Sequence, residues 1–193
     1  MNDSANLILP LRLLEIQQET AALGFAMASD LLTGSLLQTL AASKRGGKLL
    51  ELGTGTGCAT AWVLAGMDAE SQLISVESDA KVIDVARRNL GSDPRVSFHC
   101  GDAGEWLTNT RDLEFDFIFA DTWAGKYTHL EEALQLLKPG GLYIIDDLLP
   151  QPNWPDGHEI KVKNLMTHLQ QRQDLVVTKL NWSTGIMLAA KKN

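Results

Sequence analysis

Apolar positions along this chain follow two different spacings, and the spacing changes near residue 48. Before that point, residues 10–24 place apolar side chains among polar ones at intervals that predict a helix. A second helix is predicted to start at Ser29-Asp30, because either side chain can accept hydrogen bonds from the first turn. The glycine pair Gly46-Gly47 ends that region. The N-terminal part is therefore expected to be helical.

From residue 48 onward, short apolar runs alternate with helical stretches. The predicted strands are 48–53, 72–78, 95–100, 115–121, 141–147, 175–182 and 186–190. The predicted helices between them are 58–66, 79–90, 102–108, 128–137 and 158–172. Pro139-Gly140 is expected to stop the helix 128–137, since proline cannot continue a helix. The segment 150–157 reads as the one long, turn-rich loop.

This alternation predicts an α/β fold with a mostly parallel sheet that is covered by helices on both faces. Only the short turn Thr184-Gly185 separates the last two predicted strands. A parallel pair needs a long crossover, so these two strands should be antiparallel. No internal repeat, low-complexity tract or composition change divides the chain. We therefore expect residues 1–193 to form a single domain.

Composition and charge narrow the classes of partner. The chain has 193 residues, with 17 Lys and Arg against 24 Asp and Glu, for a formal net charge of −7. It carries no dense basic run, so no nucleic-acid partner is expected. No apolar run approaches the roughly 18 residues of a membrane span, and no basic segment followed by an apolar core suggests a leader. We expect no membrane association, a cytoplasmic location, and Cys58 and Cys100 as small buried side chains.

Unusual residues gather where the predicted strands end, which is where open α/β sheets bind ligands. The turn 51–57, Glu-Leu-Gly-Thr-Gly-Thr-Gly, follows the first strand, and Glu77 ends the second. Gly101-Asp102-Ala103 follows the third strand, Asp121 ends the fourth, and the pair 146–147 is Asp-Asp at the end of the fifth. Glycines let a ligand approach the backbone, and an acidic group after the second strand can accept hydrogen bonds from ribose hydroxyls. Together these features predict a nucleotide-like ligand.

The spacing of the turn helps to choose the ligand. Dinucleotide folds favour G-x-G-x-x-G, whereas this turn is G-x-G-x-G. With Glu77 and 101–103, it resembles the motifs of class I S-adenosylmethionine (SAM) methyltransferases. The resemblance implies a Rossmann-like three-layer αβα sandwich, with a seven-stranded, mostly parallel sheet whose strand seven is antiparallel. It also implies that the helices within residues 1–45 lie over the cofactor and substrate site.

The same resemblance implies a cofactor site residue by residue. Gly53, Gly55 and Gly57 would line the methionine moiety of SAM, with Glu51 near its amino group. Glu77 would bind the ribose. Asp102 and Ala103 would meet the adenine. The remaining expected cofactor residues are Thr54, Ser78, Gly101, Asp121 and Trp123.

Within this class, the chain is most similar to the catechol and caffeoyl-CoA type O-methyltransferases. The similarity rests on Asp121-Thr122-Trp123 with Tyr127, and on the polar pair that closes the fifth strand. In that family the first Asp and the pair hold a divalent metal, which implies Asp121, Asp146 and Asp147 as ligands of Mg²⁺ or a similar ion. Trp123 would lie against the adenine. Such an ion can orient a hydroxyl and stabilise its deprotonated form.

Two departures from the family pattern leave the chemistry open. The family usually has a lysine, the general base, at the position of Ala124, and this chain has Lys126 two residues later. The pair after the fifth strand is Asp-Asp, where the family usually has Asp-Asn. Lys126, His129 and His158 are the candidate bases, and the expected catalytic set is Asp121, Lys126 and His158. In the alternative without a metal, Asp147 only caps the following loop.

The expected function is methyl transfer to a hydroxyl of a small molecule. The alternatives are a metal-independent or N-directed methyltransferase, a nicotinamide-dependent oxidoreductase and a non-catalytic binding module. Glu77 suits NAD equally well, but the turn spacing does not, and Tyr127 is followed at the Tyr-x-x-x-Lys spacing by Glu131. The sequence does not identify the acceptor. The apolar first helix, with Leu11 and Leu14, could pack in its own core or in a homodimer.

Overall fold

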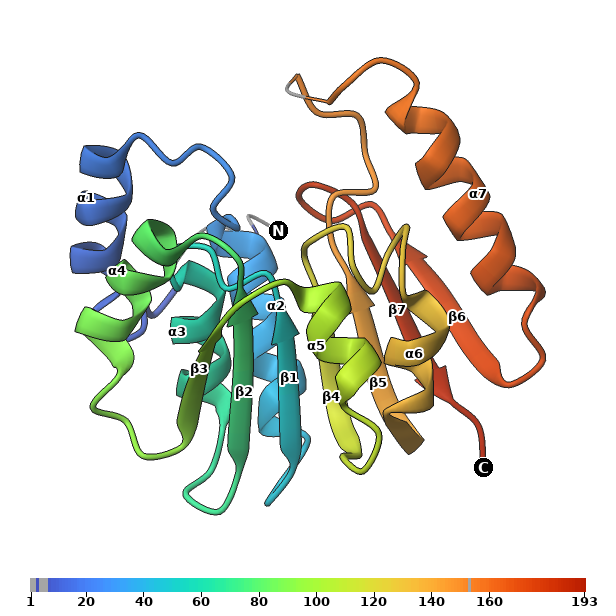
Figure 1. Ribbon diagram of the computed structural model, residues 1–193, viewed down its shortest axis with the longest axis horizontal. Coiled ribbons are helices and arrows are strands. Elements are labelled where there is room, and N and C mark those ends of the chain that lie inside the picture. The colour runs from blue at the N-terminus through green and yellow to red at the C-terminus, as the bar shows by residue number, and fades with distance from the viewer. Residues whose placement is uncertain (1–2, 4–6, 153) are drawn as a thin grey trace.

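One sheet of seven strands forms the centre of the computed structural model, which describes residue 3, residues 7–152 and residues 154–193. Its strands are Lys48–Leu52 (β1), Gln72–Glu77 (β2), Val96–Cys100 (β3), Phe115–Ala120 (β4), Leu137–Ile145 (β5), Leu175–Leu180 (β6) and Ile186–Lys191 (β7). Their order is β3-β2-β1-β4-β5-β7-β6 (Figure 1). All pairs are parallel except β5 with β7 and β6 with β7. The predicted fold class and the antiparallel seventh strand are confirmed.

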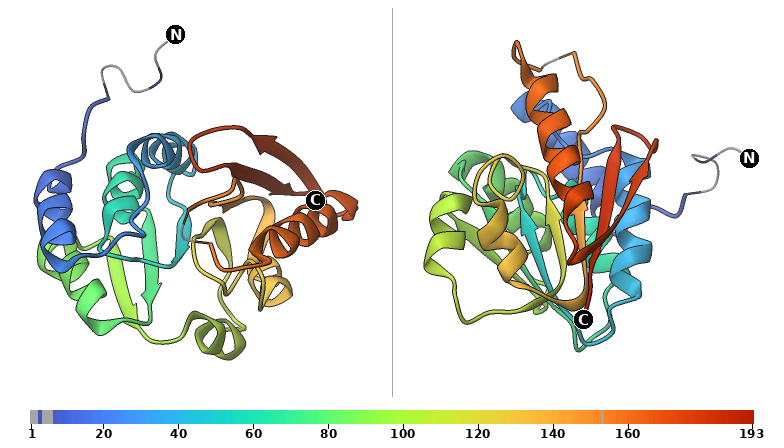
Figure 2. Two further views of the ribbon diagram at one scale, coloured as in Figure 1. Left: turned by 90° about the horizontal axis from the view of Figure 1, so that it is seen from above. Right: turned by 90° about the vertical axis from the view of Figure 1, so that its right-hand side faces the viewer.

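Helices cover both faces of this sheet. They are Leu13–Leu23 (α1), Leu31–Ala42 (α2), Cys58–Gly66 (α3), Ala80–Leu90 (α4), Ala103–Asn109 (α5), Leu130–Gln135 (α6) and His158–Gln171 (α7). One core lies between the sheet and α2, α3 and α4, and the second lies between the sheet and α5, α6 and α7. Helix α1 packs outside the first layer, against α3 and α4. Figure 2 shows the sheet between its two helical layers, with α2 on one side and α5 and α6 on the other.

The strand order reverses between β1 and β4: β2 and β3 lie on one side of β1, and β4 and β5 lie on the other. Strand β1 pairs with β2 on one side and with β4 on the other, and both pairings are parallel. Its residues from Leu49 to Leu52 are all buried, as expected of a central strand with helices on both faces. In Figure 1 the carboxyl ends of β1 and β2 point upward, toward the end where the α1–α2 connection and the segment before α7 also lie. Ligands bind at this point of reversal in open α/β sheets.

The predicted helix 128–137 is wrong at both ends. Helix α6 is shorter, and β5 already begins at Leu137, so Pro139-Gly140 lies inside a strand instead of terminating a helix. Phe115 pairs with Leu137 and Phe117 with Leu142, so a step of two residues in β4 faces a step of five in β5. This bulge accepts a proline, which has no N–H to donate to the ladder, and Gly140, whose φ is 76°.

The two cysteines differ. Cys58 is buried, as expected, but Cys100 is exposed at the end of β3, which is an edge strand. The expectation that both are buried is wrong for Cys100, because β3 has a neighbouring strand on one side only.

Among the described residues, no helix has both the length and the apolar character needed to cross a membrane.

Candidate functional site

The glycine-rich turn lies against the ends of two neighbouring strands. The N–H groups of Gly53 and Thr54 both donate to the carbonyl of Val76 in β2, at 2.9 and 3.1 Å. Gly53 has a φ of 97°, and a Cβ there would lie 2.7 Å from the carbonyl oxygen of Asp121. Glycine is needed for both reasons, the left-handed backbone and the close approach. The turn therefore brings the ends of β1, β2 and β4 together.

Glu77 is tied to this turn. The N–H of Gly55 donates to its Oε2 at 2.9 Å, and the N–H of Asp79 donates to its Oε1 at 3.0 Å. Both contacts hold the carboxylate at the carboxyl end of β2. The resemblance assigns the carboxylate at this strand end to the ribose hydroxyls.

Glu51 is a buried carboxylate beneath the turn. Its Oε2 accepts hydrogen bonds from the hydroxyls of Thr60 and Ser75, each at 2.5 Å, while Oε1 has no partner among the described residues. Burial raises the pKa of Glu51 to about 7, although the two hydroxyls lower it and Glu77 raises it further. A buried carboxylate oxygen without a donor is costly. The amino group of a bound ligand would supply the missing donor and fits this position.

One cavity of about 150 Å³ connects the strand ends. It is lined by six of the expected cofactor residues, namely Gly53, Glu77, Ser78, Asp102, Ala103 and Trp123. Asp102 also caps α5 by accepting from the N–H of Glu105 at 2.8 Å. These residues come from the end of β2, the start of α5 and the segments that follow β1, β2, β3 and β4. The fold therefore brings together residues that lie as far apart in the sequence as Gly53 and Trp123.

Six residues outside the expected cofactor set also line this cavity: Val76, Gly104, Thr122, Ala124, Thr128 and His129. A Cβ at Gly104 would lie 2.5 Å from the His129 ring, so glycine makes room for that imidazole. His129 has a φ of 53° and begins α6, and its Nδ1 is buried without a partner among the described residues. A histidine in a left-handed conformation before a short helix has no distinctive sequence pattern. Only the structure brings it beside Asp102.

Other expected cofactor residues lie around the cavity without lining it. Gly57 starts α3 with a φ of 95° and packs on α4, where a Cβ would lie 2.8 Å from that of Ala86. Thr54 is buried, with its hydroxyl 2.6 Å from that of Ser75. Gly55 lies under the ring of Phe25, from the α1–α2 connection. Gly101 continues the chain from β3.

Asp121 and Lys126 form a buried ion pair at the end of β4. Lys126 Nζ lies 3.5 Å from Asp121 Oδ1 and donates to the carbonyl of Asp146 at 3.1 Å. The second oxygen of Asp121 accepts from Ser29 Oγ at 3.0 Å. Burial raises the pKa of Asp121, and the Lys126 ammonium opposes this shift. The lysine therefore supplies the positive charge that the Asp121 carboxylate needs when it is out of water.

The Asp146-Asp147 pair closes β5. Asp146 Oδ1 accepts from the hydroxyl of Thr184 and from the N–H of Asp147, the latter at 2.7 Å. Burial and the nearby Asp121 and Asp147 raise the pKa of Asp146. Asp147 has a φ of 61°, a conformation that Asp tolerates better than most residues. Within residues 7–152 and 154–193, no group of three acidic, His or Cys side chains has an arrangement that could hold a metal ion.

An aromatic cluster surrounds His158, at the start of α7. Tyr127 Oη and His158 Nε2 share a hydrogen bond of 3.1 Å, and the Trp154 ring centre lies 4.6 Å from that of His158. Trp123 lies 5.8 Å from the same imidazole, and Lys161 Nζ is 4.0 Å from the centre of the Trp123 ring. Burial lowers the pKa of His158, and the charges of Lys161 and Lys126 lower it further. Both effects favour the neutral form of the His158 imidazole.

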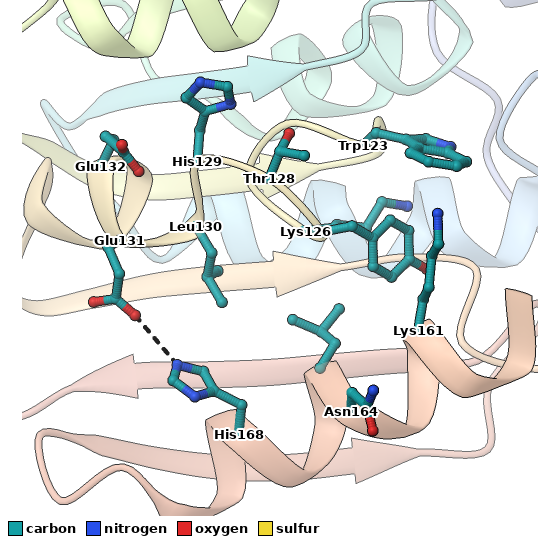
Figure 3. A pocket seen from close by; sticks show the side chains of 12 residues that line it. Trp123, Lys126, Thr128, His129, Leu130, Glu131, Glu132, Lys161, Asn164 and His168 are labelled. Atoms are coloured by element: carbon teal, nitrogen blue, oxygen red, sulfur yellow. Dashed lines mark hydrogen bonds and ion pairs between the residues drawn. The ribbon is translucent and has the colours of Figure 1, made fainter.

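A larger pocket of about 540 Å³ lies beside this cluster, between α6 and α7. Figure 3 shows Glu131 and Glu132 on the α6 side and Lys161, Asn164 and His168 on the α7 side. Trp123 and His129 line both this pocket and the smaller cavity. The two hollows therefore share a wall, which comes from the loop after β4. That arrangement allows two ligands to lie next to each other.

Comparison with known proteins agrees with this geometry. A family model described as a methyltransferase domain matches residues 50–148. A catechol O-methyltransferase of Niastella koreensis is 32% identical over 123 residues, which are 60% of this chain and 56% of that protein. The chain thus spans little more than half the length of that curated relative.

Solved structures share the fold over nearly the whole chain. An O-methyltransferase of Streptomyces achromogenes involved in tomaymycin synthesis, in complex with SAM, has a TM-score of 0.84 at 23% identity and covers 99% of this chain and 94% of its own. An O-methyltransferase of Bacillus cereus in complex with SAH has a TM-score of 0.84 at 24% identity, over 98% and 94%. At these identities the likeness shows the fold.

Proposed function

Because the chain belongs to the methyltransferase domain family, we propose that it transfers a methyl group from SAM to a hydroxyl group of a small molecule. The observation that carries this proposal is the set of expected cofactor residues around one cavity at the point where the sheet reverses. The choice of a hydroxyl acceptor is supported by the name of the Niastella koreensis relative. The acceptor itself would enter beside the loop after β4.

Four parts of SAM are proposed to meet side chains of this site. Glu77 would bind the ribose, and Asp102 and Ala103 would contact the adenine. Glu51 would accept a hydrogen bond from the amino group through its unpartnered Oε1. The sulfonium would then lie near Asp121, whose negative charge favours a cationic ligand.

The transfer is an in-line displacement, so alignment of the acceptor oxygen with the methyl group supplies much of the rate. We propose that His158 takes the hydroxyl proton, because its surroundings favour the neutral imidazole, which can accept one. The Lys126 ammonium is a donor to Asp121 and to the Asp146 carbonyl, and an ammonium has no acceptor atom. Lys126 would therefore act through its charge, and Asp121 would position it.

The N-terminal helices are proposed to cover the site. Phe25 lies over Gly55, Ser29 donates to Asp121, and Thr20 Oγ1 donates to Thr56 Oγ1 at 2.7 Å. The predicted cover spans residues 1–45, of which 1–2 and 4–6 lie outside the described residues.

A homodimer and a cytoplasmic location stay predictions. Ile8 and Leu11, each 87% exposed, are the surface that a second copy would bury.

Calorimetric titration of S-adenosylhomocysteine (SAH), the reaction product, tests the proposal. We expect micromolar binding by the wild type and weakening of at least about tenfold in Glu77→Ala, which loses the proposed bonds to the ribose. Glu114→Ala, an exposed position at the opposite end of the sheet, is the matched control and should bind like the wild type. Binding of NADH in place of SAH would instead favour an oxidoreductase. Transfer of labelled methyl from SAM to catechol then tests the acceptor class.

A further inference from the structure

The metal site implied by the family resemblance conflicts with the positions of these side chains. Its three expected ligands are Asp121, Asp146 and Asp147, and one carboxylate oxygen of Asp121 already faces an ammonium group. A divalent ion binds carboxylate oxygens at roughly 2.0–2.6 Å. An ion on Asp121 Oδ1 would therefore lie close to Lys126 Nζ, which is 3.5 Å from that oxygen. Two cations so near each other would repel strongly in a buried site.

Two further carboxylate oxygens and one main-chain oxygen at this site also accept hydrogen bonds. Asp121 Oδ2 accepts from Ser29, and Asp146 Oδ1 accepts from Thr184 and from the backbone of Asp147. The main-chain carbonyl of Asp146 accepts from Lys126 itself. Each of these donors uses a lone pair of its oxygen and competes there with an ion. Asp121 and one oxygen of Asp146 therefore already have partners of the kind that a metal would otherwise supply.

The loop after β4 holds Lys126 in this position. The N–H groups of Lys126 and Tyr127 both donate to the carbonyl of Trp123, at 3.2 and 2.8 Å, so the loop turns back on itself. Gly125 makes the turn with a φ of 84°, and its carbonyl accepts from the buried Tyr143 hydroxyl at 2.7 Å. The Lys126 side chain is only 5% exposed. Its ammonium is therefore fixed in place by a well-anchored turn, unlike that of a surface lysine.

We propose that Lys126 is a built-in cation which takes the place of the divalent ion, so that this chain binds no metal at Asp121, Asp146 and Asp147 and transfers the methyl group without one. This inference rests on the proposed function for its catalytic part. In the transfer, the acceptor oxygen forms a bond to the methyl carbon while the sulfur–carbon bond breaks, and that electron pair returns to sulfur. The hydroxyl proton leaves to His158. The fixed positive charge stabilises the oxygen as it loses that proton.

Binding of Mn²⁺, followed by electron paramagnetic resonance, tests the metal-binding half without cofactor or acceptor. The wild type is expected to leave Mn²⁺ free at millimolar concentration. Lys126→Met keeps the apolar stem and removes the charge, so it should bind Mn²⁺ at least about tenfold more tightly than the wild type. Lys126→Arg keeps the charge and should not bind. Lys163→Met, which removes an exposed charge from α7, is the matched control and should behave like the wild type.

Micromolar binding of Mn²⁺ by the wild type, lost in Asp146→Asn, would overturn the proposal. So would a Lys126→Met protein that folds but gains no binding. If Lys126→Met does not fold, the wild type and Lys126→Arg still decide, since binding by either contradicts a resident cation.

Activity supplies the second half of the test. Methyl transfer by the wild type should be unchanged by EDTA, whereas restoration by Mg²⁺ of a rate lost in EDTA would contradict the proposal. Absence of SAH binding would instead contradict the proposed function, and the conclusion from Mn²⁺ binding would be unaffected. The two failures are thus distinguishable.

Discussion

Glu51 carries a buried carboxylate that folding must either protonate or pair. Its folded pKa of about 7 exceeds the ordinary value of 4.5, so the folded state holds a proton that the unfolded state has released. The stability supplied by that proton is complete below about pH 4.5 and is lost as the pH rises through 7. A shift of this size corresponds to about 3 kcal/mol.

Glu51→Gln should therefore flatten the pH dependence of stability. The amide oxygen can still accept from Thr60 and Ser75, but it does not titrate. Urea unfolding at several pH values measures the effect, as the difference in unfolding free energy between variant and wild type. That difference should grow in favour of the variant from about pH 4.5 to pH 7. A difference that does not change with pH would show that Glu51 ionises normally in the folded protein.

His158 is the residue whose loss should affect the rate and spare cofactor binding. His158→Ala removes the proposed proton acceptor and should lower kcat by about 100-fold, near the lower end for general bases. The Kd for SAH should stay within about twofold, because the imidazole lies outside the smaller cavity. Tyr127→Phe, which loses only the bond to the imidazole, should have a smaller effect on kcat. An unchanged kcat in His158→Ala would remove it from the mechanism.

Site residues that directly follow a strand could be predicted from the sequence. Contacts that depend on how a loop folds back onto the strand ends could not. Glu77 and Asp102 were predictable because the end of a parallel strand is also the ligand edge of the sheet. The pairing of Lys126 with Asp121 was not, since it depends on how the turn at Gly125 folds back. An ion pair formed by such a loop leaves no periodic pattern in the sequence.

Among the elements, α2 begins with a cap that the sequence indicated. Asp30 accepts from the N–H groups of Leu32 and Thr33, at 2.7 and 3.2 Å, and from the hydroxyl of Thr33 at 2.8 Å. Asp30→Ala should lower the unfolding free energy by about 1 kcal/mol, the usual value for such a cap. Asp30→Ser keeps a capping oxygen and should recover most of it. Equal stability of the Ala and Ser variants in urea unfolding would contradict a capping role.

The boundary between α6 and β5 shows where local pattern fails. The segment that includes Pro139-Gly140 reads as a helix end followed by a turn, and that is the ordinary meaning of such a pair. The sheet overrides it, because β4 offers a partner to Leu137 and the surplus residues form a bulge. Element type and order were predictable for most of the chain, whereas this boundary depends on pairing across the sheet.

Ligand binding should stabilise the whole molecule, because the cavity draws on strands and loops from both halves of the sheet. At an SAH concentration of 100 times Kd, linkage adds about 2.7 kcal/mol to the unfolding free energy. For a chain of this size, that corresponds to a rise in Tm of roughly 5–10 °C. Scanning fluorimetry measures it, with NADH as the control ligand that should give no rise. A constant Tm at that SAH concentration would contradict preferential binding of SAH to the folded chain.

At the scale of the molecule, the strand order was the part that local patterns could not supply. Alternating strands and helices fix the class, but they do not say that β4 lies next to β1 or that β7 inserts between β5 and β6. Long-range contacts set that order. One example is the bond at 2.9 Å from Trp182 Nε1, beyond β6, to the carbonyl of Leu32 in α2.

The two thiols differ in burial, so one of them can be labelled selectively with a fluorescent dye. Cys100 is exposed on the edge strand and immediately precedes Gly101-Asp102, whereas Cys58 is buried and burial raises its pKa. Only a thiolate attacks alkylating dyes, so a maleimide fluorophore should attach to Cys100 alone in the folded protein. A dye there lies next to the adenine end of the proposed site. Its emission would follow cofactor arrival and departure in real time, without the introduction of a cysteine.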